Sequence, residues 1–204
     1  MEFSLFEYLA DHHVEGYSQV KSLEAEKGTL LYQPPQRITP IYELVKGAVK
    51  IGTYSPQGEE ICYDLLRPGD FFGNLQYLNG QFSEFARTLT PVILRSYEQP
   101  FFKKITTYIP EISEWFSYKL VNRWCMAEDR LYAVRSMDAR EKVQRIIKQF
   151  QGNLEDATGK NQLVFDLLTM QDLADLTGMT RQTVSKVIKE EYFRTSLARS
   201  KRKS

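Results

Sequence analysis

Cysteine and histidine are scarce in this sequence, with two of each among its 204 residues. Cys62 and Cys125 lie far apart, which excludes a disulfide framework and leaves too few thiolates for an all-cysteine iron–sulfur cluster. His12 and His13 are adjacent on a segment with a polar side, so we expect them to face solvent rather than to ligate a haem iron or a metal ion. We therefore expect no cofactor, no metal site and a location in the reducing cytoplasm.

Long apolar runs are missing as well, and none approaches the length needed to cross a membrane. Residues 1–16 combine apolar with acidic side chains and carry no basic leader. This pattern excludes a secretory signal peptide and is typical of a short amphipathic helix that packs on the domain behind it. We accordingly expect no membrane among the partners of this chain.

Neither sign of charge dominates, because 27 lysines and arginines oppose 26 aspartates and glutamates. The balance is uneven along the chain: residues 138–204 carry 13 basic side chains against 9 acidic ones, and residues 1–137 carry 14 against 17. A basic excess on one half is what attraction to nucleic-acid phosphates requires. Much of that excess comes from the basic run at 199–203, which is also typical of a solvated end.

Turn-forming residues recur at short intervals through the first hundred residues, at 27–28, 33–35, 46–47, 55–58 and 67–70. Between and after these turns lie short runs rich in β-branched, aromatic and leucine residues, at 41–45, 48–54, 61–66 and 91–97. Even spacing of this kind predicts an antiparallel β-barrel or jelly roll.

From Pro110 the apolar residues follow a helical period. A helix over residues 111–137 would be roughly 40 Å long, which is too long for one small β domain to cover. We predict that it pairs with its own copy across a two-fold axis and makes the protein a homodimer; the alternative is a stripe that packs on its own domain. The predicted dimer stripe consists of Phe116, Leu120, Trp124, Ala127, Leu131 and Val134.

Residues 169–190 are the most informative segment, because they predict two short helices joined by a tight turn. Thr169 can cap the first helix, with Asp172 as the acid of a capping box, and Gly178 stands where that helix must end in a left-handed residue. Thr180 can cap the second helix, whose buried face would hold Thr183, Val184, Val187 and Ile188. The spacing is typical of a helix-turn-helix.

The second of these helices leaves polar and basic side chains on its outer face. Arginine and lysine bind guanine edges in the major groove, and glutamine binds adenine. Paired across a two-fold axis, such helices would bind an inverted repeat in double-stranded DNA. The alternative is an ordinary helical hairpin with a solvated face. The predicted DNA-binding residues are Thr169, Thr180, Arg181, Gln182, Ser185, Lys186 and Lys189.

The segment between the long helix and the helix-turn-helix has weaker signals. Asp138 can cap a further amphipathic helix that continues to Phe150. The polar stretch 151–160 is predicted to be a loop, and residues 163–168 a short strand or extended lead-in.

The order of these elements resembles the Crp/Fnr superfamily of bacterial transcription regulators, over residues 27 to 190. The resemblance rests on Lys27-Gly28, 41–47, Gly58-Glu59-Glu60, 67–73 and the helix-turn-helix. It implies an α+β fold with a cyclic-nucleotide-binding-like β-roll over 1–110, a dimerisation helix over 111–137 and a helix-turn-helix domain over 138–204. On this match, the base-reading positions of the family hold Arg181, Gln182 and Lys186.

The effector region departs from the family's cyclic-nucleotide binders. Those proteins have a glutamate for the ribose and an Arg-Ser or Arg-Thr pair for the phosphate, whereas this chain has Asn74 and, near the arginine position, Glu84. An acid repels a phosphate, so we predict no cyclic-AMP binding by the usual mode. The region is instead filled by side chains or accepts an apolar or different, unknown small-molecule effector. Its predicted lining is Phe72, Gly73, Asn74, Leu75, Tyr77, Phe85 and Arg87-Thr88, a slipped version of the phosphate-binding pair.

The second departure follows the recognition helix, where family members have a β-hairpin wing. Residues 191–204 contain no turn-forming glycine and no second strand pattern, which predicts either that the wing is missing or that the natural terminus has been altered. Three classes of function follow: a homodimeric transcription regulator, with DNA and RNA polymerase as candidate partners; a degenerate member that dimerises or senses a ligand without binding specific DNA; and a cupin-like metalloenzyme. The sequence argues against the third class, so we expect no enzyme, because metal ligation in such a barrel needs clustered histidines and residues 28–100 contain none.

Overall fold

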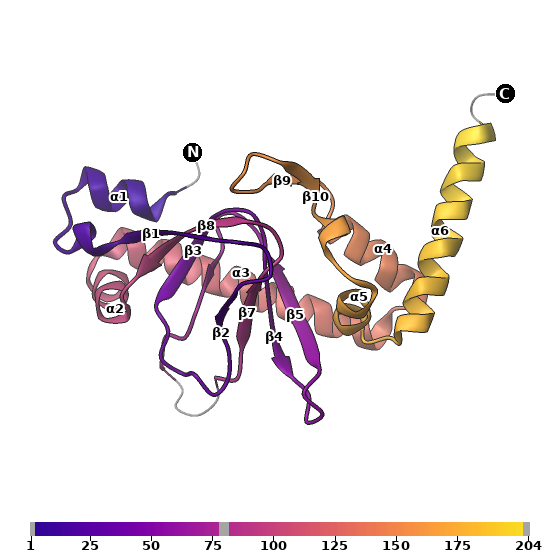
Figure 1. Ribbon diagram of the computed structural model, residues 1–204, viewed down its shortest axis with the longest axis horizontal. Coiled ribbons are helices and arrows are strands. Elements are labelled where there is room, and N and C mark those ends of the chain that lie inside the picture. The colour runs from indigo at the N-terminus through magenta and orange to yellow at the C-terminus, as the bar shows by residue number, and fades with distance from the viewer. Residues whose placement is uncertain (1–2, 78–81, 202–204) are drawn as a thin grey trace.

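The computed structural model describes residues 3–77 and 82–201, with side chains as far as Glu191. An N-terminal antiparallel β domain is followed by one long helix and a C-terminal helical domain (Figure 1). The predicted α+β fold class is confirmed.

Two four-stranded antiparallel sheets form the β-roll. The strand order is β1-β8-β3-β6 in one sheet and β2-β7-β4-β5 in the other. Alternate residues of these strands point into the space between the sheets, where Leu44, Val49 and Leu94 are completely buried. The strands are β1 (Lys21–Ala25), β2 (Leu30–Tyr32), β3 (Ile41–Lys46), β4 (Val49–Tyr54), β5 (Glu60–Leu66), β6 (Phe71–Phe72), β7 (Phe85–Thr88) and β8 (Val92–Tyr97).

The turn between β3 and β4 requires a glycine for two reasons. Gly47 has a φ of +87°, which side chains of L-residues rarely adopt. A Cβ at this position would also lie 2.6 Å from the carbonyl oxygen of Pro91. The sequence predicted a turn at Lys46-Gly47. The structure has a tight turn here, between the end of β3 and the start of β4, and Gly47 lies against Pro91 and Val92 at the start of β8.

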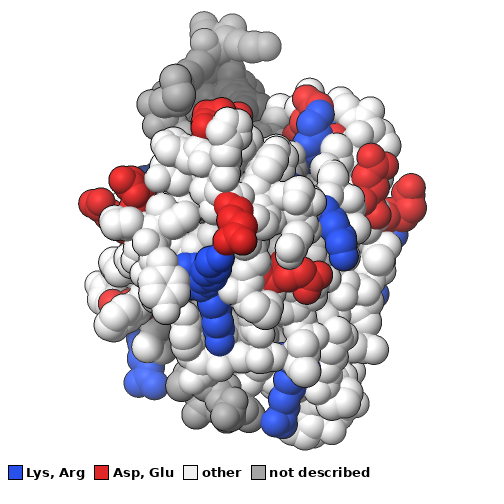
Figure 2. Space-filling view, turned by 90° about the vertical axis from the view of Figure 1, so that its left-hand side faces the viewer, with Lys and Arg blue, Asp and Glu red and all other residues white. Residues whose placement is uncertain are grey.

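Helices α1 (Leu5–Asp11) and α2 (Gln99–Tyr108) cover one end of the roll. Leu5 and Leu9 of α1 are buried in a cluster with Phe102 and Ile105 of α2, which confirms the amphipathic N-terminal helix. Seen from this side, charged residues of both signs are scattered over a mostly uncharged surface (Figure 2). This face of the molecule therefore carries no continuous basic surface.

Helix α3 (Pro110–Ser136) differs by one residue at each end from the predicted range of 111–137. The two ends of the predicted stripe contact their own chain: Phe116 packs edge-on against Phe102, and Val134 contacts the glycine turn of the C-terminal domain. The middle of the stripe is exposed, including Leu120, Trp124, Ala127 and Leu131. The unpartnered apolar surface is therefore shorter than the predicted stripe.

The C-terminal domain begins with α4 (Ala139–Gln149), for which Asp138 and Glu141 form a capping box. The predicted loop at 151–160 was wrong in part, because β9 (Asn153–Glu155) and β10 (Asn161–Leu163) form an antiparallel hairpin. The predicted strand at 163–168 was also wrong beyond Leu163, since residues 165–167 form a 3-10 turn. Two backbone hydrogen bonds and one ion pair join the hairpin to the roll: Gly47 N donates to the Glu155 carbonyl oxygen, Ala157 N donates to the Pro91 carbonyl oxygen, and Lys46 pairs with the Glu155 carboxylate.

Two helices complete the chain, α5 (Met170–Thr177) and α6 (Arg181–Lys201). Helix α6 stands at the end of the molecule opposite α1 and α2 (Figure 1). It continues as one helix through residues 191–201, where the resemblance would place a wing.

Candidate nucleic-acid interface

The first helix of the motif begins and ends as its sequence predicts. The Thr169 hydroxyl accepts the backbone N–H of Asp172 at 3.1 Å, and the Asp172 carboxylate accepts the Thr169 N–H at 2.9 Å. This capping box satisfies backbone donors that a helix otherwise leaves free. At the other end Gly178 adopts the left-handed conformation, with a φ of +63°.

The turn after α5 packs directly against α3. A Cβ built on Gly178 would lie 2.8 Å from Cγ1 of Val134, which is closer than real Cβ contacts. Gly178 is therefore required both by its backbone conformation and by the close approach of the long helix. This contact fixes the motif on the C-terminal half of α3.

Replacing Gly178 with alanine is expected to destabilise the protein through both effects. The left-handed conformation costs about 1–2 kcal/mol for alanine, and the clash with Val134 adds about 1 kcal/mol or more. Gly159→Ala is the matched control, because Gly159 has a φ of +84° but nothing within 4 Å of the added Cβ. Urea unfolding of the two variants measures the difference, and equal losses of stability would contradict the close packing on α3.

Helix α6 presents the predicted outer face to solvent. Thr180 caps it by accepting the Thr183 N–H at 3.2 Å, and Val184, Val187 and Ile188 are buried on the inner face. Six of the seven predicted DNA-binding residues are exposed and Ser185 is half-buried. The exposed ones are Thr169, Thr180, Arg181, Gln182, Lys186 and Lys189.

Polar contacts also join α6 to α4. Glu191 accepts from Arg140 at 2.5 Å and from Gln144 at 3.0 Å. The Glu191 carboxylate is thus paired with a cation of α4, while the exposed Arg181, Gln182 and Lys186 make the first turns of the outer face basic and polar. Such a surface is suited to the floor of a DNA groove.

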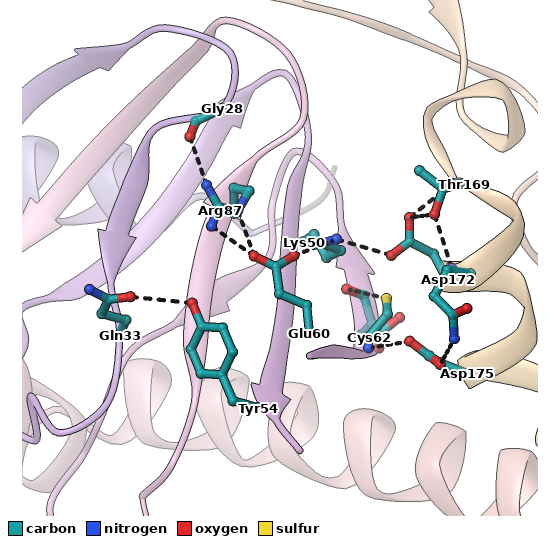
Figure 3. Close-up of polar contacts among 12 residues, drawn as sticks. Gly28, Gln33, Lys50, Tyr54, Glu60, Cys62, Arg87, Thr169, Asp172 and Asp175 are labelled. Carbon is teal, nitrogen blue, oxygen red and sulfur yellow. Dashed lines mark hydrogen bonds and ion pairs between the residues drawn. The ribbon is translucent and has the colours of Figure 1, made fainter. Parts of the chain in front are cut away.

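Helix α5 also contacts the β-roll, through polar groups that sequence reasoning missed (Figure 3). Lys50 of β4 reaches the Asp172 carboxylate at 3.0 Å, and Cys62 N of β5 donates to Asp175 at 2.8 Å. Burial opposes the charge of Lys50, but its hydrogen bonds to Glu60 and Asp172 outweigh that effect and raise its pKa. The available signal was a lysine within the apolar run Ala48–Ile51.

Arg87 and Thr88 do not form a phosphate-binding pair. Arg87 donates to the Glu60 carboxylate at 2.7 Å and to the Gly28 oxygen at 3.1 Å. Thr88 is buried, and its hydroxyl accepts the Thr29 N–H and donates to the Glu26 oxygen. Both side chains are therefore engaged within the roll, away from the cavity described next.

A cavity of about 450 Å³ lies between the β-roll, α3 and the end of α4. Three predicted effector-pocket residues, Phe72, Gly73 and Leu75, line it. The other five lie off its wall. Asn74 donates its amide to the Arg37 oxygen, Tyr77 is exposed, and Phe85 is completely buried against Tyr54; Arg87 and Thr88 are held as above. The structure thus brings three of the eight predicted residues to this cavity and holds the other five in contacts elsewhere.

Acidic groups form part of the cavity wall. Glu84 accepts the Tyr32 hydroxyl at 2.5 Å, and Asp70 accepts the Arg67 N–H at 2.7 Å. Burial raises the pKa of both carboxyl groups, and the hydrogen bonds that they accept offset it only in part. Arg123 of α3 also lines the cavity and donates to the Phe71 oxygen at 3.1 Å. Glu84, the acid found in the sequence near the family's arginine position, therefore lies on the wall of this cavity.

An apolar surface remains open on α3. Tyr118, Val121 and Tyr132 are between 54% and 69% exposed, as are Trp124 and Leu131 of the predicted stripe. Isolated exposed apolar residues are normal, but a row of them along one helix marks an interaction surface. Cys125 lies in this exposed stretch, whereas Cys62 is buried in the roll and burial raises the pKa of its thiol.

Comparison with known proteins agrees with this architecture. The family model of the cyclic nucleotide-binding domain matches residues 22–107. The global nitrogen regulator of Synechococcus elongatus is 32% identical over 169 residues, which cover 80% of this chain and 75% of that protein. The CRP-like cAMP-activated global transcriptional regulator of Mycobacterium tuberculosis is 26% identical over 171 residues, or 83% of this chain and 76% of that protein.

The chain belongs to the Crp/Fnr superfamily of transcription regulators. The solved structure of FixK2 from Bradyrhizobium japonicum has the same fold, with a TM-score of 0.69 at 17% identity over 86% of each chain. The curated relatives named here are global regulators, as their names state. Within residues 3–77 and 82–201, no helix is long and apolar enough to cross a membrane, and no group of three or more histidine, cysteine or acidic side chains could hold a metal ion.

Proposed function

We propose that this Crp/Fnr regulator binds specific DNA sequences as a homodimer, with one α6 in the major groove of each half-site. The exposed face of α6 carries this proposal, because Arg181, Gln182 and Lys186 stand together on a capped helix whose opposite side is buried. Residues 138–204 would form the DNA-binding domain, residues 111–137 the dimerisation helix and residues 1–110 the effector domain. The protein would act in the cytoplasm, where it would meet DNA and RNA polymerase.

Dimerisation follows from the apolar surface of α3. Trp124 and Leu131 are 66% and 57% exposed, and they lie two turns apart on the same helix. A second copy of α3 across a two-fold axis would cover both, and would present two recognition helices to an inverted repeat. A palindromic operator has two identical half-sites, so it requires one recognition helix from each chain of the dimer.

Selection of binding sites from random duplex DNA, at about physiological salt and without any effector, tests this proposal. The expected result is an inverted repeat with half-sites about one helical turn apart. A selected sequence without two-fold symmetry would contradict the dimeric arrangement. The selection is then repeated with cell extract as a source of effectors. If neither selection recovers a sequence, a second candidate function is favoured.

That second candidate is a dimeric ligand sensor without specific DNA binding. The continuation of α6 to Lys201, in place of a wing, is the observation that favours it. Wing contacts to the DNA backbone would then be lost, and phosphate contacts supply much of the affinity of such complexes. The exposed polar face of α6 is the reason for preferring the DNA-binding function.

Cyclic AMP is expected neither to bind in the cavity nor to change DNA affinity. Glu84 stands on the cavity wall and would repel a cyclic phosphate, and Arg87 is held by Glu60 outside the cavity. A ligand present at a hundred times its Kd would stabilise the protein by about 2.7 kcal/mol. Thermal unfolding with and without millimolar cyclic AMP checks this, and a saturable rise in Tm would contradict it.

A further inference from the structure

A buried ion pair joins the β-roll to the first helix of the DNA-binding motif. Lys50 Nζ lies 3.0 Å from Asp172 Oδ1, and the two side chains are 10% and 4% exposed. Lys50 belongs to β4 and Asp172 to the first turn of α5, so the pair spans 122 positions of sequence. In a buried site the energy of such a contact depends steeply on geometry, because water cannot replace either partner.

Each partner of this pair is itself held in place. Lys50 also contacts Glu60 Oε2 at 2.9 Å, and the other oxygen of Glu60 accepts from Arg87 at 2.7 Å. The second oxygen of Asp172 accepts the backbone N–H and the hydroxyl of Thr169. A continuous chain of charged contacts therefore runs from β7 to the capping box of α5 (Figure 3).

A second polar contact and an apolar cluster also join α5 to the roll, so that α5 cannot pivot about the ion pair alone. Asp175, one turn along α5, accepts the Cys62 N–H of β5 at 2.8 Å and the Gln171 amide at 2.9 Å. Side chains of the roll and of α5 share one buried cluster, which includes Ala48, Cys62, Leu65, Leu173 and Leu176. Two polar contacts one helical turn apart, on a common apolar base, define the direction of α5 relative to the roll.

The docked arrangement leaves the DNA-binding face open. The roll contacts α5, whereas Arg181, Gln182 and Lys186 of α6 remain exposed. The contact therefore orients the recognition helix without covering it. In a dimer whose α3 helices are paired, the angle between roll and motif would determine the distance between the two α6 helices.

We propose that Lys50 and Asp172 are positioning residues that determine which half-site spacing the dimer accepts. This inference rests on the proposed DNA-binding function and adds a determinant of operator choice that touches no DNA. The ion pair would hold α5 at one angle, and so hold both recognition helices at one separation. Loss of the pair would let that separation vary, and operators of several spacings would then bind with similar affinity.

Lys50→Met tests the proposal, because it removes the ammonium group and keeps the apolar stem. Glu60 retains Arg87, and Asp172 retains the bonds of its capping box. Lys46→Met is the matched control, since Lys46 forms another ion pair between the two domains, with Glu155 at 2.6 Å, but both side chains are more than 40% exposed. Asp172→Asn removes the charge at the other end of the buried pair and leaves an oxygen that can still accept from Thr169.

The measurement is the affinity of each variant for a series of operators, built from the selected half-site at the selected spacing and at one or two base pairs more or less. We expect the wild type and Lys46→Met to prefer one spacing by at least about tenfold. Lys50→Met and Asp172→Asn should reduce that preference to about threefold or less, and the double variant should be no worse than either single one. Affinity for an isolated half-site should not change.

Hydrogen exchange of the DNA-free protein gives a second, independent measurement. Backbone amides of Glu60–Leu66 and Met170–Thr177 should exchange faster in Lys50→Met, but not in Lys46→Met. An unchanged spacing preference in Lys50→Met would overturn the proposal, whether or not exchange becomes faster. Higher affinity at every spacing would also overturn it, by showing that the pair inhibits binding. Failure of the wild type to bind any operator would instead overturn the proposed function, and this inference with it.

Discussion

Replacement of Trp124 and Leu131 by glutamate is expected to abolish the dimer and with it binding to an inverted repeat. Both side chains are more than half exposed on α3 and have few contacts within their own chain to lose. In a paired helix they would be buried, and two unpaired carboxylates there would cost several kcal/mol. We expect a monomer in analytical ultracentrifugation and a loss of operator affinity of about 100-fold or more, because two linked contacts become one.

Tyr108→Glu is the control for this double substitution. Tyr108 is 79% exposed at the end of α2, away from α3's open surface, so the new charge should leave both dimer and affinity intact. All variants should retain the circular dichroism of the folded wild type, while the double variant should lose the rise of Tm with protein concentration that a dimer shows. A double variant that remained a dimer would place the interface elsewhere on the molecule.

Replacement of Arg181 by alanine is expected to lower affinity for the selected operator by about 1–3 kcal/mol per half-site, or about 5- to 160-fold for each. Arg181 is exposed at the first position of α6, where a guanidinium group can bind a guanine edge with two hydrogen bonds. Repeated site selection should show the loss of preference at one base pair per half-site. The affinity for non-specific DNA should fall much less, because the substitution removes only one of many positive charges that attract phosphates.

Lys103→Ala is the charge-matched control for Arg181→Ala. Lys103 lies on α2 at the opposite end of the molecule from α6, so its removal should not change sequence preference (Figure 1). Arg181→Lys should recover charge without the two-pronged contact, and we expect it to recover little of the specificity. An operator affinity that Arg181→Ala leaves unchanged would show that α6 does not enter the groove as proposed.

The elements that the sequence predicted well are those specified by local signals. Thr169 and Asp172 cap α5, Gly178 ends it, and the period of apolar residues after Pro110 gives α3 to within one residue at each end. Each of these signals acts within a few positions, where side-chain hydrogen bonds and backbone preferences decide the structure.

The β9–β10 hairpin could not be predicted in the same way. Its strands are only three residues long, Asn-Leu-Glu and Asn-Gln-Leu, which is too short to show a period, and they contain no β-branched or aromatic residue. What stabilises the hairpin lies elsewhere in the sequence: Gly47, Pro91 and Lys46 of the roll bond to Glu155 and Ala157. Pairing with a distant segment leaves no local pattern.

In the predicted effector region, side-chain directions likewise depend on contacts with distant segments and could not be predicted from a local pattern. Arg87 was predicted to line the pocket as part of a slipped phosphate-binding pair, but β7 pairs with β4 so that Arg87 lies opposite Lys50. Two adjacent cations need an acid between them, and Glu60 of the next strand supplies it. The direction of the arginine is thus determined by strand register, which the sequence motif alone does not contain.

In the proposed complex, two α6 helices carried by one dimer bind two half-sites together. The most direct test compares the affinity of the protein for the selected inverted repeat with its affinity for an equally long duplex that keeps one half-site and scrambles the other. We predict that the inverted repeat binds at least about 100-fold tighter, with two chains per duplex. Equal affinities, or one chain on the inverted repeat, would contradict the claim.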